Sequence, residues 1–393
     1  MKYVSVQDLV EQNRVVIKTG PFGTQLKASE YVSFGTPVLN VRNLGFATVN
    51  TDKLEMVSDG TLERLSAHKL VTGDIVFGRK GAVERHAFIS ESENGWMQGS
   101  DCIRLRVLAD SVNPRFLSYY FLTKRHRAFM MSMCSHGTTM ASLNQKIIEK
   151  IIVPLPERSI QDKVVEILAT LDKQIATNQK INDNLEQQAL ALFNNFYDQS
   201  NTEVNFTDLI QILGGGTPKT GESMYWNGNI PFFTPKDVGT PYTLVTEKTI
   251  TEDGLSHCNS RLYSVNTVFV TARGTVGKIG LAGVPMAMNQ SCYALVGKNL
   301  NQLLVYFYAL KAVDRLKHKA SGAVFDAIIT RDFETEQIFK LSEDDTNTFI
   351  KIVEPMYQLI LNNSVENQRL IALRNSLLPK LMSGEVDLSD IQL

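Results

Sequence analysis

The sequence predicts a mixed α/β protein in which a strand-rich globular domain occurs in two copies. Two long helices, expected to form an antiparallel coiled coil, join the copies. The main observation is internal repetition, since Val4–Val10 (VSVQDLV) returns as Val204–Ile210 (VNFTDLI). Each copy is also followed by a stretch with heptad-like apolar spacing. A length of 393 residues is enough for two or three hydrophobic cores.

Further repeats run through the whole chain. Gly81-Ala-Val returns as Gly274-Thr-Val, and Asp101-Cys102 returns as Ser291-Cys292. Ser135-His136-Gly137 is matched by Ser321-Gly322. The offset between the copies drifts from about 185 to about 200 residues, as insertions in surface loops would cause. We therefore expect two equivalent domains that perform one task at two places.

Within each copy we expect short strands and one prominent helix. Short β-branched segments predict the strands: Val15–Ile17, Asp74–Phe77, Cys102–Val107 and Thr267–Thr271. The helix of the first copy is expected to begin at Asn113-Pro114 and to end in the basic cluster 124–127; its counterpart spans 303–319. Basic residues at a helix end either complement the helix dipole or contact phosphate, and the sequence leaves both interpretations open.

Two helices of about 40 residues are predicted near 159–198 and 344–382. The first follows Val153-Pro-Leu-Pro156, with Ser159 as its expected N-cap, and Gly384 is the expected cap after the second. Each helix would span about 60 Å at 1.5 Å per residue. Apolar positions and one asparagine per helix are expected to pair the two helices: Leu171, Ile175, Asn178, Leu185, Met356, Asn363 and Leu370. A simple dimerising or core-packing role for the helices is the alternative.

The net charge of −1 hides a pattern that follows these boundaries. Lys and Arg outnumber Asp and Glu by 4 in the first domain (1–157) and by 1 in the second (200–340). The first helix (158–199) has a net charge of −2, and the second helix with its tail (341–393) has −4. Positive charge therefore gathers in the globular domains, where a local basic face would suit a phosphate backbone.

Several chemistries find no support in the sequence. The four cysteines form no CxxC pair and the six histidines show no metal-ligand spacing. Asn113-Pro-Arg-Phe116 lacks the second proline of a methyltransferase box, and Gly274–Lys278 lacks the spacer of a P-loop. Gly214-Gly-Gly216 follows a short helix-like run and is not a dinucleotide-binding fingerprint. With no signal peptide or apolar run of about 18 residues, we expect a cytoplasmic binding protein and not an enzyme.

Loops that carry glycine, basic and amide residues are the candidate DNA-contacting segments. Arg reads guanine edges, Asn and Gln read adenine, and Lys mostly contacts phosphate. The candidates in the first copy are Thr24, Gln25, Lys27, Arg42, Arg79, Lys80, Arg85, Gln98, Ser100 and His136. Those in the second copy are Thr217, Lys219, Lys236, Arg273, Thr275, Lys278, Asn289, Gln290 and Ser321. Ordinary turn chemistry is the alternative for each of them.

Over its full length the chain resembles the specificity subunits of type I restriction–modification systems. The motifs that carry the resemblance are Gly214–Lys219 (GGGTPK), Tyr225–Pro231 (YWNGNIP), Arg273–Gly280 (RGTVGKIG), Val153–Glu157 (VPLPE) and Leu377–Glu385 (LLPKLMSGE). The first copy departs from the pattern with Gly20-Pro-Phe-Gly-Thr, and the second lacks a clear Pro-Leu-Pro before its helix.

The resemblance implies two target-recognition domains, each reading one half of a bipartite, asymmetric site in double-stranded DNA. It implies that the helices set the spacing and dock two methyltransferase subunits, which use S-adenosylmethionine to methylate adenine N6. Separate motor and endonuclease subunits would restrict the DNA, and this chain would bind no cofactor and no membrane. A helical assembly scaffold that binds no DNA and a standalone DNA-modifying enzyme are the alternatives.

Overall fold

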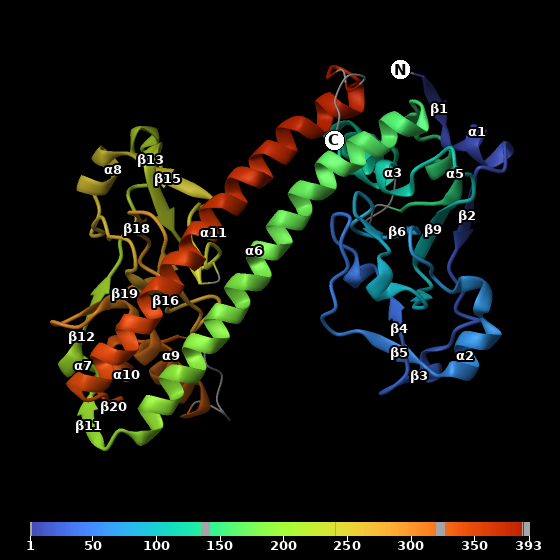
Figure 1. The fold of residues 1–393 in the computed structure, drawn as a ribbon. Helices are drawn as coiled ribbons and strands as arrows, with labels where there is room; N and C mark the ends of the chain where they lie inside the picture. The colour runs from blue at the N-terminus through green and yellow to red at the C-terminus, as the bar shows by residue number, and fades with distance from the viewer. Residues whose placement is uncertain (1, 135–141, 240, 320–326, 387, 389–393) are drawn as a thin grey trace. The chain divides into compact units, whose positions relative to one another are not determined.

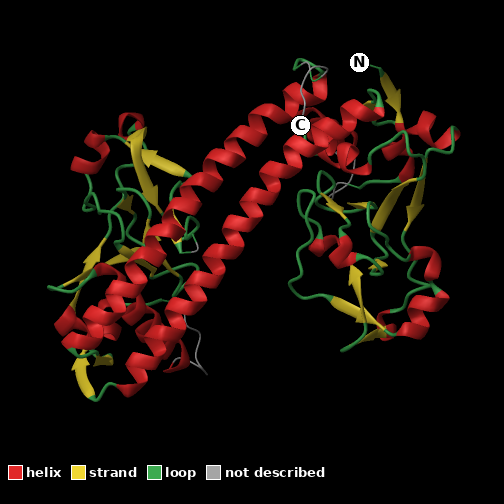
Figure 2. Ribbon diagram, in the orientation of Figure 1, coloured by secondary structure: helices red, strands yellow, loops and turns green. Residues whose placement is uncertain are grey.

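The computed structural model describes residues 2–134, 142–239, 241–319, 327–386 and 388. Contacts divide the chain into two compact units. Unit 1 comprises Met1–Lys173 with Ile371–Leu393, and unit 2 comprises Gln174–Leu370. Each unit holds one globular copy and parts of two long helices, α6 (Arg158–Gln199) and α11 (Glu343–Ser383) (Figure 1). Each globular copy combines short strands with helices, which confirms the predicted mixed α/β class (Figure 2).

Two four-stranded sheets form the centre of the copy in unit 1. The antiparallel sheet has the strand order β2 (Val15–Thr19), β9 (Cys102–Val107), β6 (Ile75–Gly78) and β7 (His86–Phe88). The second sheet has the order β3 (Tyr31–Val32), β5 (Glu55–Val57), β4 (Thr36–Leu39) and β8 (Met97–Gln98), with β4 and β8 parallel. The predicted strands at Val15, Asp74 and Cys102 are therefore present.

Short helices cover these sheets. They are α1 (Val6–Glu11), η1 (Ala28–Glu30), η2 (Val41–Asn43), α2 (Asp59–Arg64), η3 (Ser66–His68), η4 (Glu91–Glu93), α3 (Pro114–Phe121), α4 (Lys124–Cys134) and α5 (Gln145–Glu149). Asn113 caps α3 as predicted, because its side chain accepts hydrogen bonds from the Arg115 and Phe116 amides. The expected single helix is wrong beyond Phe121. The basic cluster 124–127 begins the separate helix α4, and His126 in that cluster is buried.

Unit 2 repeats this plan. Its larger sheet has the strand order β12 (Ile210–Gly214), β19 (Cys292–Gly297), β16 (Val268–Thr271), β17 (Ile279–Ala282) and β14 (Tyr242–Thr243). Its smaller sheet has the strand order β15 (Lys248–Ile250), β13 (Trp226–Phe233) and β18 (Ala287–Met288). Its short helices are α7 (Phe206–Leu209), η5 (Ser223–Tyr225), α8 (Glu252–Ser256), α9 (Gln302–Lys319) and α10 (Thr330–Glu334). Gly214 ends strand β12, so the expectation that it follows a helix-like run is wrong.

A two-stranded antiparallel ladder closes each copy before the chain enters its long helix. In unit 1, β1 (Tyr3–Ser5) pairs with β10 (Ile152–Pro154). In unit 2, β11 (Thr202–Asn205) pairs with β20 (Gln337–Lys340). The first strand of each copy thus holds the base of the helix that leaves it.

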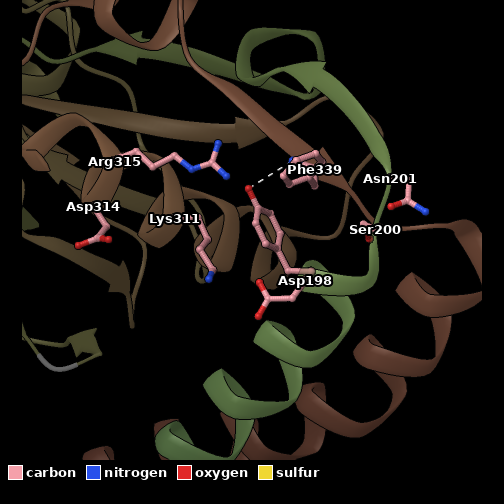
Figure 3. A pocket seen from close by; sticks show the side chains of 8 residues that line it. Asp198, Ser200, Asn201, Lys311, Asp314, Arg315 and Phe339 are labelled. Atoms are coloured by element: carbon pink, nitrogen blue, oxygen red, sulfur yellow. Dashed lines mark hydrogen bonds between the residues drawn. The ribbon is translucent and has the colours of Figure 1, made fainter. Parts of the chain in front are cut away.

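A cavity of about 500 Å³ lies where α6 ends in unit 2, between α6, α9 and β20 (Figure 3). The Tyr197 hydroxyl accepts a hydrogen bond from the Phe339 amide at 3.2 Å, and the Lys311 ammonium lies 5.0 Å from the Tyr197 ring centroid. Two acidic and two basic side chains line the cavity and balance in charge: Asp198, Asp314, Lys311 and Arg315. The contacts of Tyr197 fasten the end of α6 to the second copy.

The long helices pack against each other in an antiparallel arrangement, as predicted. In unit 2, two buried pairs of asparagines lie between them. Asn178 donates to the Oδ1 of Asn367 at 3.0 Å, and Asn363 donates to the Oδ1 of Asn182 at 2.8 Å. Higher numbers on α6 pair with lower numbers on α11, which is the antiparallel direction. The two pairs also correspond to each other in the internal repeat. Asn363 lies 185 residues after Asn178, and Asn367 lies 185 residues after Asn182.

In unit 1 a single carboxylate ties both long helices to the globular copy. Asp172 of α6 accepts a hydrogen bond from the Tyr119 hydroxyl of α3 at 2.7 Å. The same carboxylate pairs with Arg374 of α11 at 2.7 Å and with Arg115 of α3 at 3.5 Å. The Arg115 guanidinium also lies 4.6 Å from the Phe88 ring centroid.

The predicted helix seam is correct in part. Ile175, Asn178 and Asn363 are buried, and Leu171, Leu185, Met356 and Leu370 are partly buried. Ile181, Ile352, Leu359 and Leu373, which belong to the same apolar spacing of the two helices, are 40–46% exposed, while Asn182, Asn367 and Tyr357 are buried. The reason is that each long helix also packs against a globular copy, so its buried face is not the face of an isolated coiled coil.

The helix ends follow the expected chemistry at one end only. Gly384 has φ +74° and its amide donates to Leu381 O, while Glu385 N donates to Lys380 O. This is a Schellman motif, and it confirms the predicted cap. Helix α6 begins at Arg158, so Ser159 lies inside the first turn and is not the N-cap.

We predict that the asparagine pairs are coupled. Replacing Asn182 by Ala removes its bond to Asn363 and leaves a buried amide without its partner, which should cost about 1–3 kcal/mol of unfolding free energy. The double variant Asn182→Ala/Asn363→Ala should cost less than the sum of the single variants, measured by denaturant unfolding. The exposed Asn184→Ala on the same helix is the matched control, and additive costs at 182 and 363 would contradict the pairing.

We also predict that unit 1 loses stability in acid. Burial lowers the pKa of His86 to about 3, helped by the neighbouring His126 and Arg115, and burial lowers the pKa of His126 to about 3. Because the unfolded chain takes up protons below about pH 6.5 and the folded chain does not, stability should fall as the pH drops from about 6.5 toward 3.

Thermal melting between pH 7 and 4 tests this prediction. His126→Phe, which suits the ring cluster around Phe121, should flatten the pH dependence by about 1.4 kcal/mol per pH unit below 6.5. His257→Phe at an exposed position of unit 2 is the control. Identical pH profiles for His126→Phe and the wild type would contradict the prediction.

Candidate nucleic-acid interface

Four loops meet at one end of the sheets in unit 1. They are the loop after β2 (20–27), the η2 segment after β4 (40–43), the β6–β7 loop (79–85) and the β8–β9 turn (98–101). Three backbone hydrogen bonds link them: Gly20 N donates to Cys102 O at the start of β9, Gly99 N of the β8–β9 turn donates to Leu39 O at the end of β4, and Arg79 N donates to Asp101 O of the β8–β9 turn. These links hold loops far apart in sequence against one another.

The same four loops meet in unit 2, at 214–220, 234–237, 272–278 and 288–291. Gly216 N donates to Met288 O, Asn289 N to Phe233 O and Ala272 N to Ser291 O. The Thr275 hydroxyl donates to Pro235 O at 3.2 Å, which joins the second and third loops. We call each of these arrangements a four-loop site.

A glycine is required at the centre of each four-loop site. A Cβ atom on Gly20 would lie 2.0 Å from Gly99 O, and a Cβ on Gly215 would lie 2.1 Å from Asn289 O. The close approach is between backbones, so neither contact can be relieved by rotating a side chain. In the β6–β7 and β16–β17 loops, Gly81 (φ +76°) and Gly274 (φ +81°) both adopt the left-handed conformation. The two sites therefore share one backbone frame.

The side chains of unit 1 form charged pairs around this frame. Lys80 Nζ lies 3.7 Å from the Asp101 carboxylate, and both groups are half exposed or more. Arg42 donates to the Glu55 carboxylate at 2.8 Å, and Asn40 Nδ2 donates to its other oxygen at 2.6 Å. Glu55 comes from β5, which brings a carboxylate to the rim of the site.

The site of unit 2 is a cavity of about 470 Å³ with a cationic lining. Lys236, Lys248 and Arg273 face it together with the single carboxylate of Glu247. Lys236 Nζ lies 3.9 Å from the Glu247 carboxylate, and Lys248 Nζ lies 5.6 Å from the Trp226 ring centroid. Asn289, Ser291, Thr234 and Thr275 add hydrogen-bonding groups to the lining. Such a surface can receive phosphate or base-edge acceptors.

The structure brings most of the predicted contact residues to these two sites. The exposed candidates are Thr24, Gln25, Lys27, Arg42, Lys80, Arg85, Lys219, Lys236, Arg273, Thr275, Lys278 and Gln290, and the half-buried ones are Arg79, Ser100, Thr217 and Asn289. His136 and Ser321 lie outside the described residues.

Gln98 needs a correction. Its side chain is fully buried, and its amide nitrogen Nε2 donates hydrogen bonds to Lys18 O at 2.9 Å and to Cys102 O at 3.0 Å. Gln98 therefore braces the turn from inside, and its side chain is not on a surface that a duplex can reach.

Sequence reasoning missed Asn40, Glu55 and Lys248. Asn40 precedes η2 in the loop sequence, while Glu55 and Lys248 lie on β5 and β15, where a lone charge reads as an ordinary surface residue. The internal repeat could have revealed Glu55 and Lys248, because β5 and β15 are equivalent strands and carry opposite charges at the same position.

The ionisable groups of the described residues bear on two kinds of chemistry, metal binding and thiol reactivity. Within the described ranges, no group of three or more His, Cys, Asp or Glu residues could hold a metal ion. Burial raises the pKa of the Cys102 and Cys292 thiols to about 12, so both stay protonated and unreactive at neutral pH. In the part of the chain that the structure describes, no helix is both long and apolar enough to cross a bilayer.

Comparisons with known proteins agree with this picture. The family model of the type I restriction modification DNA specificity domain matches residues 13–187 and again residues 199–373. The chain is 21% identical over 308 residues to the Type I restriction enzyme MjaIX specificity subunit of Methanocaldococcus jannaschii, covering 72% of this chain and 71% of that protein. It is 20% identical over 397 residues to the HindI specificity subunit of Haemophilus influenzae, covering 80% and 86% respectively.

A solved structure shares the fold. The crystal structure of the type I restriction–modification S subunit from M. genitalium matches with a TM-score of 0.60 at 14% identity, covering 99% of this chain and 96% of that one. The family match covers both copies and most of the chain. The chain therefore belongs to the type I restriction–modification DNA specificity family, as a specificity subunit with two target-recognition domains.

Proposed function

We propose that the two four-loop sites are the DNA-reading surfaces of this specificity subunit. Each site would contact one half of a bipartite, asymmetric sequence in double-stranded DNA. In this proposal residues 1–157 and 200–340 are the recognition domains, while 158–199 and 341–393 form the spacer helices and tail. One observation carries the proposal. The two four-loop sites share the same backbone arrangement, but each presents a different set of exposed polar side chains.

The physical reason is that the backbone of each four-loop site and its exposed side chains have different roles. Main-chain contacts and glycines fix where the loops lie, and exposed Arg, Lys, Asn and Gln decide which base edges they accept. In unit 1 the exposed Lys80 occupies the position that the exposed Arg273 occupies in unit 2, since each forms the equivalent β-bridge, to Ser142 and Ala327 respectively. Equivalent frames with unlike side chains suit two half-sites of different sequence.

The family relationship supports the rest of the proposal. The paired helices would hold the two readers at a fixed spacing and dock two methyltransferase subunits. Those subunits would supply S-adenosylmethionine and methylate adenine N6, and through them restriction subunits would join the complex. This chain would contribute recognition only and act in the cytoplasm.

Exchange of one recognition domain tests this function. The segment 1–157 is replaced by the matching segment of another specificity subunit, and the chimera is expressed with its methyltransferase subunits. Mapping of methylated adenines across a genome should show one altered half-site and one unchanged half-site. The reciprocal exchange of 200–340 should alter the other half only.

Three outcomes would contradict the proposal. A change in both half-sites after one exchange would show that the domains do not read independently. Absence of salt-dependent, sequence-specific DNA binding in the complex would favour a helical scaffold. Methylation or cleavage by the isolated chain with S-adenosylmethionine or a divalent metal would favour a standalone enzyme.

A further inference from the structure

The two sites differ most sharply at one equivalent strand position. Glu55 of β5 lies opposite Val38 of β4, and Lys248 of β15 lies opposite Phe232 of β13. Two residues after Val38 and Phe232, each globular copy makes the same local turn. Asn40 N donates to Asn43 Oδ1 at 3.1 Å, and Thr234 N donates to Asp237 Oδ2 at 2.8 Å. By this register, Glu55 corresponds to Lys248, Asn40 to Thr234 and Arg42 to Lys236.

Glu55 organises its neighbours in unit 1. One carboxylate oxygen accepts from Arg42 at 2.8 Å and the other from Asn40 at 2.6 Å. The Arg42 side chain is 54% exposed, so the guanidinium stays accessible to a ligand while Glu55 holds it. An arginine held in this way loses little rotamer entropy when it binds a base edge, because its orientation is already set.

A carboxylate at a DNA-reading surface has an electrostatic cost. It repels the phosphate backbone, and a solvent-exposed Arg–Glu pair contributes little to folding stability. The Glu55 side chain is 36% exposed and lies on β5, at the rim of the four-loop site. Its placement is explained if it orients Arg42 and Asn40 for recognition.

Lys248 reverses the charge in unit 2. No carboxylate occupies the corresponding place, and the ammonium lines the cavity beside Lys236 and Arg273. The Lys248 side chain lies along the Trp226 ring, which holds it without neutralising it. Glu247, one residue earlier, faces Lys236 at 3.9 Å between two exposed side chains, which is a weak pairing.

We propose that this strand position determines sequence specificity in both recognition domains. Glu55 is a positioning residue that holds Arg42 and Asn40 for readout of one base pair in the first half-site. Lys248 contacts the second half-site directly, with its ammonium donating to acceptor atoms on a base edge. The inference rests on the proposed function, and it adds residues and roles to that proposal.

Base preference in methylated sites tests the inference. Complexes of the full chain with its methyltransferase subunits carry Glu55→Gln, Arg42→Lys, the double variant, or Lys248→Gln. Glu55→Gln and Arg42→Lys should each reduce discrimination about tenfold or more at the same base pair of the first half-site, since a bidentate contact is lost or misplaced. The double variant should lose no more than Arg42→Lys alone.

Lys248→Gln should change only the second half-site. It should also lower the slope of binding against salt concentration by about one, because one cation is removed. Exposed Glu63→Gln of unit 1 and Lys340→Gln of unit 2 are matched controls that should leave both halves unchanged. Circular dichroism confirms folding, and Arg42→Lys decides the unit 1 claim should Glu55→Gln fail to fold.

The outcomes separate this inference from the proposed function. Wild-type methylation of a bipartite site, with unchanged base preference in Glu55→Gln, Arg42→Lys and Lys248→Gln, overturns the inference and leaves the function standing. Additive losses in the double variant overturn the positioning role of Glu55. A wild-type complex that methylates no bipartite site rejects the proposed function itself.

Discussion

The buried asparagine pairs between α6 and α11 are the constraint on which the arrangement of the long helices depends. An apolar seam tolerates a slip by one heptad, because leucine packs against leucine in either register. A buried amide does not, since a slip leaves its donor and acceptor without partners. Asn178–Asn367 and Asn182–Asn363 therefore specify one antiparallel register at some cost in stability. The asparagines of α6 and α11 occupy equivalent positions of the internal repeat, which indicates that the two long helices are built on the same plan.

A second constraint acts in the globular copies. Gly20 and Gly215 allow backbones to approach so closely that any side chain there would collide with a carbonyl oxygen. The two-stranded ladders β1–β10 and β11–β20 then close each copy at the base of its helix. Loops that are fixed in this way can change their exposed residues without moving. Specificity can thus diverge between the copies while the fold stays constant.

Much of the fold could be predicted from the sequence, because repetition and helical periodicity are local signals. The strands at Val15 and Cys102, the cap at Asn113 and the stop at Gly384 depend on neighbouring residues, and all are present. The break between α3 and α4 and the phase of the helix seams could not be predicted. Those features depend on which third element a helix packs against, as the exposed Leu359 and the buried Tyr357 illustrate.

The candidate sites show the same division between local and tertiary information. Glycine turns and basic loop residues identified segments that the fold brings together in the four-loop sites, yet Gln98 turned inward, where its amide donates to two carbonyl groups. Glu55 and Lys248 were missed because their meaning lies in the register of β4 with β5 and of β13 with β15. A strand residue becomes recognisable as part of a site only when its partners across the sheet are known.

The proposed role of the helix pair as a spacer can be measured directly. Seven residues are inserted into α6 after Lys180 and seven into α11 after Val365, which lie opposite each other between the two asparagine pairs. At 1.5 Å per residue the pair lengthens by about 10 Å, or about three base pairs of duplex. Mapping of methylated sites should show both half-sites unchanged and the gap between them longer by about that amount. An unchanged gap with full methylation would contradict the spacer role.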